Sequence, residues 1–194
     1  MLSMDTARRT VALINVLCAA EEGAEGEARA AVTAVLREHG EPEPFVLTGA
    51  DLADLRAAAL LLREVFAAGD TGGAAGTDLA AEALNGLLSR TRGGLRLTSH
   101  SGTTPWHPHL DGDDEAPWGE WFLASSCLAL TVLLWDRGAA PGGLCGAAGC
   151  PHVYLAHGAG PERRYCSRRC ATRERVAAHR RARAAERTAA PGGA

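Results

Sequence analysis

The stretch "TGADLADLRAAALLLREVFAAG", residues 48–69, decides the fold because it carries the clearest helical pattern in the chain. Its apolar residues recur every three or four positions, at Leu52, Leu55, Ala59, Leu62 and Phe66. This spacing places them on one face of a helix. Thr48 and Asp51 begin the stretch with a pattern typical of a capping box, and Gly69 ends it. The chain is therefore expected to be mainly α.

Further helical patterns lie on both sides of this stretch. They are expected at residues 6–20 and 26–39, from Thr77 to near Gly93 and Gly94, and at residues 118–136. The segment "DTGGAAG" before residue 77 predicts a flexible loop, and Trp135 is expected in the buried stripe of the last helix. Together these patterns predict a helical N-terminal domain at residues 1–140.

The helical period is broken at residues 95–110, where "LRLTS" and "WHPHL" predict a small β-hairpin. His107 and His109 alternate along the second strand, so they would point to the same face. His100 precedes them, and the acidic run "DGDDE" follows. These residues are interpreted either as a second metal or small-ligand site, or as an exposed hairpin edge beside an acidic turn.

Asn15 and Asn85 are polar residues inside apolar helical patterns. Asn15 and Asn85 either hydrogen-bond to each other or to a ligand, or they form local caps on their own helices. With His107 and His109 they form the candidate ligand pocket of the helical domain. The sequence shows no phosphate-binding loop, nucleophile elbow or carboxylate pair at a catalytic spacing, so we expect the protein not to be an enzyme.

Charge divides the chain into two parts. Its 194 residues carry a net charge of −3, which is −10 over residues 1–144 and +7 over residues 145–194. A basic tail suggests a polyanionic partner, and the alternatives are a solvated charged helix or a tail that folds onto its own acidic body.

No apolar run approaches 18 residues, so no membrane span is expected. Arg8 and Arg9 before "TVALINVLCAA" imitate a signal peptide, but Asn15 interrupts the run and the pattern continues as a helix. We expect a cytoplasmic protein, whose clustered cysteines then indicate a metal before a disulfide.

Four of the six cysteines lie within residues 145–170. They form two pairs, with four residues between Cys145 and Cys150 and three between Cys166 and Cys170. Two short pairs joined by a fifteen-residue gap match a tetrahedral Zn²⁺ site. A closed site of four thiolates leaves no position for water, so one structural zinc ion is expected.

The local sequence predicts how this module folds. Gly146 and Gly149 permit a tight knuckle at the first pair, and "VYL" and "RRYC" are expected to pair as a hairpin around "HGAGPE". Ser167 can cap a helix that begins at the second pair. Knuckle, hairpin and helix predict a treble-clef-like zinc finger. Three histidines are alternative ligands: His152, His157 and His179.

This segment resembles the CGNR-type zinc finger. The four cysteines match its ligands, and Arg173 matches the arginine of its signature, whose Gly-Asn is replaced by Ala171 and Thr172. The remaining matches are the basic pair and the aromatic position: Arg163, Arg164 and Tyr165. The resemblance implies a finger with a basic helix at residues 141–187, followed by a disordered tail at residues 188–194.

The upstream residues are similar to the helical ABATE domain that precedes such fingers. The segments that carry this likeness are "VALINVL" with Asn15, "LRAAALLLREVF", and "AEALNGLLSR" with Asn85. The resemblance implies a stress-induced transcriptional regulator of bacterial type, with duplex DNA bound by the finger. It also implies a small-molecule or protein partner at the helical domain. The lack of a long apolar run predicts no membrane partner.

The candidate nucleic-acid contacts are all arginines: Arg163, Arg164, Arg168, Arg169, Arg173, Arg175, Arg180, Arg181 and Arg183. Most would contact phosphates, and one or two would reach bases. The alternative function is a protein- or RNA-interaction module without sequence-specific DNA binding. An enzyme acting in a pocket of the helical domain is a third interpretation.

Overall fold

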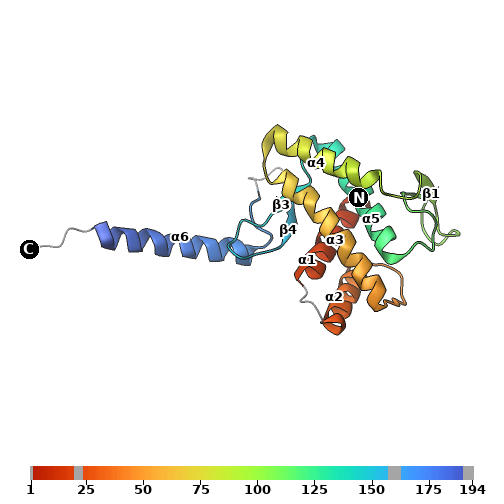
Figure 1. Ribbon diagram of the computed structural model, residues 1–194, viewed down its shortest axis with the longest axis horizontal. Coiled ribbons are helices and arrows are strands. Elements are labelled where there is room, and N and C mark those ends of the chain that lie inside the picture. The colour runs from red at the N-terminus through yellow and green to blue at the C-terminus, as the bar shows by residue number, and fades with distance from the viewer. Residues whose placement is uncertain (1, 20–23, 157–162, 190–194) are drawn as a thin grey trace, which may run out of the picture.

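The computed structural model describes residues 2–19, 24–156 and 163–189, and the expected mainly α fold is confirmed. The helices are α1 (Leu2–Ala19), α2 (Glu25–Glu38), α3 (Gly49–Gly69), α4 (Gly73–Leu88), α5 (Trp118–Arg137) and α6 (Arg168–Ala189). Two antiparallel hairpins pair β1 (Arg96–Thr98) with β2 (His107–His109), and β3 (Gly142–Leu144) with β4 (Val153–Leu155). Helices α1 to α5 form one body, from which α6 extends (Figure 1).

Helix α3 is the central element, packed against α1, α2, α4, α5 and the β3–β4 hairpin. Its capping box forms as predicted, because Asp51 N donates to Thr48 Oγ1 at 3.1 Å and Thr48 N donates to Asp51 Oδ2 at 2.8 Å. Leu62 and Phe66 are fully buried, each with 0% of its surface exposed. The stretch that predicted the fold therefore carries its core.

Helix α4 begins and ends earlier than the sequence predicted, since its last residue is Leu88 and the expected end was near Gly93. It starts at Gly73, so the second half of the expected loop "DTGGAAG" is helical. A Cβ at Gly76 would lie 2.9 Å from the carbonyl oxygen of Gly69, which shows how closely α4 approaches the end of α3. This packing outweighs the low helix propensity of glycine.

Helix α5 is a core helix with a different buried stripe from the one expected. By length and composition alone, with a mean hydropathy of 1.3, it could cross a membrane. It packs against α1, α3 and α4, with Phe122 and Leu130 fully buried. The prediction for Trp135 is wrong, because this side chain is 82% exposed. The predicted stripe advanced in steps of three residues, and because a helix has 3.6 residues per turn, such a stripe turns away from the core. The buried residues instead follow mixed steps of three and four, which end at Leu133.

The second hairpin differs from the prediction in its partner strand. "VYL" forms β4 as expected, but it pairs with Gly142–Leu144 and not with "RRYC". Any side chain at Gly142 would collide with the carbonyl oxygen of Tyr154, so this glycine allows the pairing. Val153 and Leu155 are buried in the same core as α1 and α3. The hairpin that begins the finger thus packs as part of the helical body.

Candidate metal centre

Three short segments bring the four cysteines together at the start of α6. Cys145 follows β3, where its N–H donates to His152 O at 2.8 Å. The knuckle closes through Cys150 N, which donates to Ala147 O at 3.0 Å, and Gly149 adopts a left-handed φ of 69°. The chain before α6 is fixed to this knuckle because Gly146 N donates to Arg164 O at 2.8 Å.

The four sulfur atoms have the spacing of a tetrahedral metal site. The Sγ of Cys166 lies 3.7 Å from those of Cys150 and Cys170, which are 3.8 Å apart, and all four Sγ lie within 4.8 Å of one another. A tetrahedron with Zn–S distances of about 2.3 Å requires sulfurs about 3.8 Å apart. All four thiols are free of disulfides. The predicted cysteines are therefore positioned to bind a metal ion.

Groups around the sulfurs would support thiolate ligands. Cys166 N donates to Cys145 Sγ at 3.3 Å, and the Arg173 guanidinium lies 4.0 Å from Cys170 Sγ. Ser167 Oγ accepts from Cys170 N at 3.2 Å, so the predicted cap of α6 is confirmed. The Ser167 hydroxyl lowers the pKa of Cys170, whereas burial raises the pKa of Cys166. A bound dication would overcome this burial cost and ionise the set.

The module around these cysteines has little apolar core of its own. Its buried residues are Cys145, Ala147 and Cys170, with Cys150, Tyr165 and Cys166 packed against them. Segments shorter than about 40 residues rarely fold on apolar burial alone. Metal ligation is therefore the main interaction available to fix the knuckle against the first turn of α6.

The predicted arginine contacts fall into two groups. Arg163 donates to the carbonyl oxygens of Tyr165 at 2.9 Å and Cys166 at 2.6 Å, and Arg173 donates to Ala148 O at 3.2 Å. These two arginines brace the metal-binding segment. Within the described residues, the other seven have exposed side chains without a hydrogen bond or ion pair: Arg164, Arg168, Arg169, Arg175, Arg180, Arg181 and Arg183.

The residues of the expected ligand pocket do not all gather at one place. Asn15 lies on α1, where its side chain accepts from Val153 N at 2.8 Å and donates to Val153 O at 3.2 Å. Asn85 is exposed on α4. His107 and His109 lie together on β2, with His100 beside them. Among the described residues, no hydrogen bond joins either asparagine to these histidines. Asn15 instead fixes the edge of β4 to the helical body.

Of the three expected alternative ligands, His152 lies beside the cysteine set. His152 Nδ1 lies 3.8 Å from Cys166 Sγ, while the four cysteines alone make up the metal-binding group at this site in the described chain. His179 is exposed further along α6, and His157 lies outside the described residues. Helix α6 continues to Ala189, so the first two residues of the expected tail are helical; residues 190–194 lie outside the described part.

A cysteine knuckle, a β-hairpin and a helix that carries the last cysteine define a small zinc-finger-type module. Residues 143–183 match the family model of the CGNR zinc finger, and this range contains all four cysteines and the nine arginines. No curated protein matches the chain.

Proposed function

We propose that the protein is a regulator that binds duplex DNA through its C-terminal finger, with one structural zinc ion at the four cysteines. The observation that carries this proposal is the row of α6 arginines whose side chains have no hydrogen bond or ion pair within the described residues. Between residues 163 and 183 the chain has nine arginines and a single acidic residue, Glu174. Glu174 is occupied at the knuckle, where its carboxylate accepts from Ala148 N at 2.9 Å. The positive charge of the helix is therefore available to a polyanion.

Zinc fits the donor set best. Four thiolates are soft ligands, and their spacing near 3.8 Å suits a tetrahedral ion. Because four protein ligands would fill the tetrahedral coordination of the ion, no position remains for water, and the zinc would be structural and not catalytic. It would fix Cys166 and Cys170 against the knuckle and thereby set the direction in which α6 leaves the body.

The form of α6 favours a duplex over a single strand. Its 22 residues span about 33 Å, and the major groove of B-DNA is wide enough to admit an α-helix. Single-stranded RNA and DNA are bound largely by stacking on aromatic side chains. The sequence of α6 contains no Phe, Tyr or Trp.

The beginning of α6 offers a place for a phosphate. A shallow hollow there is lined by Arg163, Arg164, Tyr165, Ser167, Arg168 and Ala171. Helix N-termini attract anions because their N–H groups are unpaired and the helix dipole is positive there. A backbone phosphate in this hollow would anchor the helix against one strand of the duplex.

The acidic body has a separate role in this proposal. Its net charge of −10 over residues 1–144 would repel DNA, which confines binding to the finger. We propose that residues 1–140 form an ABATE-type regulatory domain that receives a small-molecule or protein signal. The protein would act in the cytoplasm, without enzymatic activity and without a membrane partner.

The test is the salt dependence of binding to a labelled duplex. Replacing Arg168 and Arg169 by alanine should weaken binding and reduce the slope of log K against log salt by about 2, since each lost phosphate contact removes about 0.9. The matched control replaces Arg90 and Arg92, two exposed arginines of the acidic body, and should leave the slope unchanged.

Three results would contradict the proposal. Equal slopes for the parent and the Arg168/Arg169 double variant would mean that α6 does not contact the duplex. Equal binding of single-stranded RNA and duplex DNA would favour the RNA-interaction alternative, and no binding of either would favour a protein partner.

A further inference from the structure

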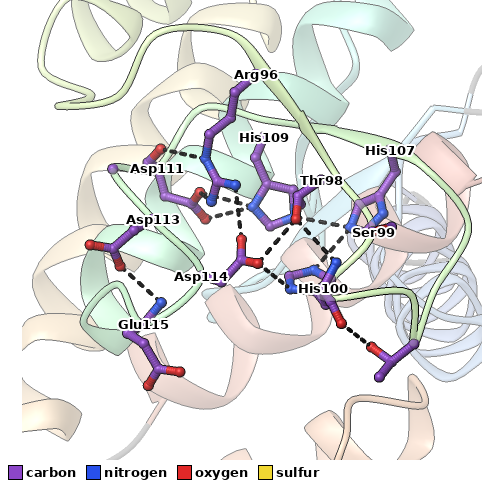
Figure 2. A network of polar contacts seen from close by, with 12 residues as sticks. Arg96, Thr98, Ser99, His100, His107, His109, Asp111, Asp113, Asp114 and Glu115 are labelled. Carbon is purple, nitrogen blue, oxygen red and sulfur yellow. Dashed lines mark hydrogen bonds and ion pairs between the residues drawn. The ribbon is translucent and has the colours of Figure 1, made fainter.

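The β1–β2 hairpin gathers three imidazoles at one point, away from the cysteines. His100 follows β1, and His107 and His109 lie on β2 (Figure 2). His107 Nε2 lies 3.2 Å from His100 Nε2 and 3.0 Å from His109 Nε2. The ligand nitrogens of all three lie within 4.8 Å of one another. The hairpin and α6 are at opposite ends of the molecule (Figure 1).

The other nitrogen of each ring faces an oxygen that can only accept. His109 Nδ1 lies 2.8 Å from Asp111 Oδ1, His107 Nδ1 2.8 Å from Pro105 O, and His100 Nδ1 3.3 Å from Asp114 Oδ2. A neutral imidazole carries one N–H, and which nitrogen bears it is set by the partner of that nitrogen. Each neutral ring therefore places its proton on Nδ1 and a lone pair on Nε2.

Three lone pairs that converge at such short distances need a shared cation. A proton on one Nε2 can join two rings, but it leaves the third unsatisfied. A single metal ion accepts all three lone pairs, and Zn–N distances of about 2.0–2.1 Å place tetrahedral nitrogens about 3.4 Å apart. The observed separations of 3.0 and 3.2 Å are close to this value.

The oxygens behind the histidines are themselves held in place. The Asp111 side chain is 2% exposed, and Arg96 donates to it at 2.8 Å. Arg96 also pairs with Asp114 at 2.8 Å, and Thr98 Oγ1 donates to Asp114 at 3.0 Å. Carboxylates that orient ligand histidines in this way are typical of metal sites in proteins.

The backbone supports the same arrangement. His100 and Ser101 have φ values of 46° and 58°, in the left-handed region that residues other than glycine rarely adopt. Such strain persists where the surroundings fix it, and it often marks a binding site. Here it turns the His100 ring toward the two rings on β2.

We propose that His100, His107 and His109 bind a divalent transition metal of the class that prefers imidazole, with Zn²⁺ as the probe. This site goes beyond the proposed DNA binding and is independent of the cysteine centre. Three protein ligands leave a fourth position for water or an external ligand. The His100 side chain is 33% exposed, so the cluster is accessible to solvent at this residue. The hairpin would thus give the helical domain its own metal-dependent input.

Metal content of the full chain tests the proposal. The protein is stripped with chelator, loaded with Zn²⁺ and freed of excess metal, and zinc is then counted per chain. The parent should hold two, and His107→Ala and Cys166→Ser should each hold one. His179→Ala is the matched control, because His179 is exposed on α6, and it should still hold two. One zinc in the parent, or two in His107→Ala, would overturn the proposal.

A second measurement separates coordination from folding. Asp111→Asn keeps the shape of the side chain but removes the charge that orients His109. The affinity of the histidine site should fall 10- to 100-fold, as is typical when such supporting groups are changed. Zinc at the cysteines should remain and the helical body should still unfold cooperatively, which together report that both parts of the chain are folded. Unchanged affinity at the histidine site in this variant would contradict the proposed role of Asp111.

Discussion

The helical body and the finger are stabilised in different ways. The body buries Leu62, Phe66 and Phe122 completely, in a core shared by α1 to α5 and the β3–β4 hairpin. The metal-binding segment buries little beyond its own cysteines and Ala147. The body therefore depends on apolar burial, whereas the finger has four cysteines positioned to bind a metal ion in place of such a core. This difference allows α6 to present arginines instead of packing against the body.

The two regions meet at the β3–β4 hairpin. The β3–β4 hairpin belongs to the matched finger segment in sequence, yet Val153 and Leu155 lie in the body's core. We predict that the helical domain expected at residues 1–140 folds without the finger, and this stays a prediction. The structure indicates that ending the chain there would uncover α1 and α3, where the hairpin packs.

Removing the metal ligand Cys166 should give the largest effect. Structural zinc contributes on the order of 10 kcal/mol to folding such a module. In Cys166→Ser the knuckle and the first turns of α6 should lose protection from hydrogen exchange, while the amides of α3 keep theirs. Global loss of protection in α3 would show that body and finger form a single cooperative unit.

Truncation of a core side chain should destabilise the body and leave the finger unchanged. Phe66→Ala should lower the free energy of unfolding of the body by about 3–5 kcal/mol, because it removes a fully buried ring and leaves a cavity. Leu60→Ala, on the same helix but 51% exposed, is the control and should change it by less than about 0.5 kcal/mol. Zinc per chain should stay unchanged in both folded variants. Loss of zinc from folded Phe66→Ala would show that the metal centre depends on the core of the body, which contradicts the separate stabilisation of the two regions.

The junction between the regions can be tested at Asn15. Asn15→Ala would leave both Val153 N–H and C=O without their side-chain partner, at a cost of about 1–3 kcal/mol. Asn85→Ala is the matched control, because Asn85 is exposed, and denaturant unfolding should show almost no change. Equal effects of the two substitutions would mean that Asn15 does not join the regions.

The smallest effect is expected at the cap of α3. Thr48→Ala should cost about 1 kcal/mol, as is usual when a capping side chain is lost. The Thr48 hydroxyl lowers the pKa of Asp51, so the cap stabilises the protein at neutral pH and this contribution is lost as the pH falls through the lowered pKa. The difference between parent and variant should therefore shrink in acid. A difference that grows in acid would contradict this assignment.

Local patterns made the central helix and the cysteine centre predictable. The helical spacing of Leu52 to Phe66 and the cap at Thr48 depend on neighbours within one or two turns. Paired cysteines at short spacings indicate a metal site by residue type alone. Tertiary packing decided the rest. The pairing of β4 with Gly142–Leu144 depends on a glycine that admits a facing strand, and no local rule places Asn15 against Val153.

The histidine cluster lies between these two cases. The alternation of His107 and His109 predicted that the two side chains share a face. It left open whether this face is a metal or small-ligand site or an exposed hairpin edge. Convergence with His100 depends on the left-handed turn at His100 and Ser101, and the proton positions depend on Asp111 and Asp114. Non-glycine residues with positive φ cannot be identified from local sequence alone, so the position of His100 beside the other two histidines could not be assigned before the fold was known.

The central claim is that a metal ion, and not an apolar core, orders the arginine surface of α6 for DNA. It is tested most directly by measuring duplex affinity across a salt series for zinc-loaded protein and for Cys166→Ser. We predict that the variant binds at least tenfold more weakly at each salt concentration, because the finger must then be ordered on binding. Equal affinity and an equal salt slope for the two proteins would contradict the claim, since a disordered tail of the same charge would then suffice.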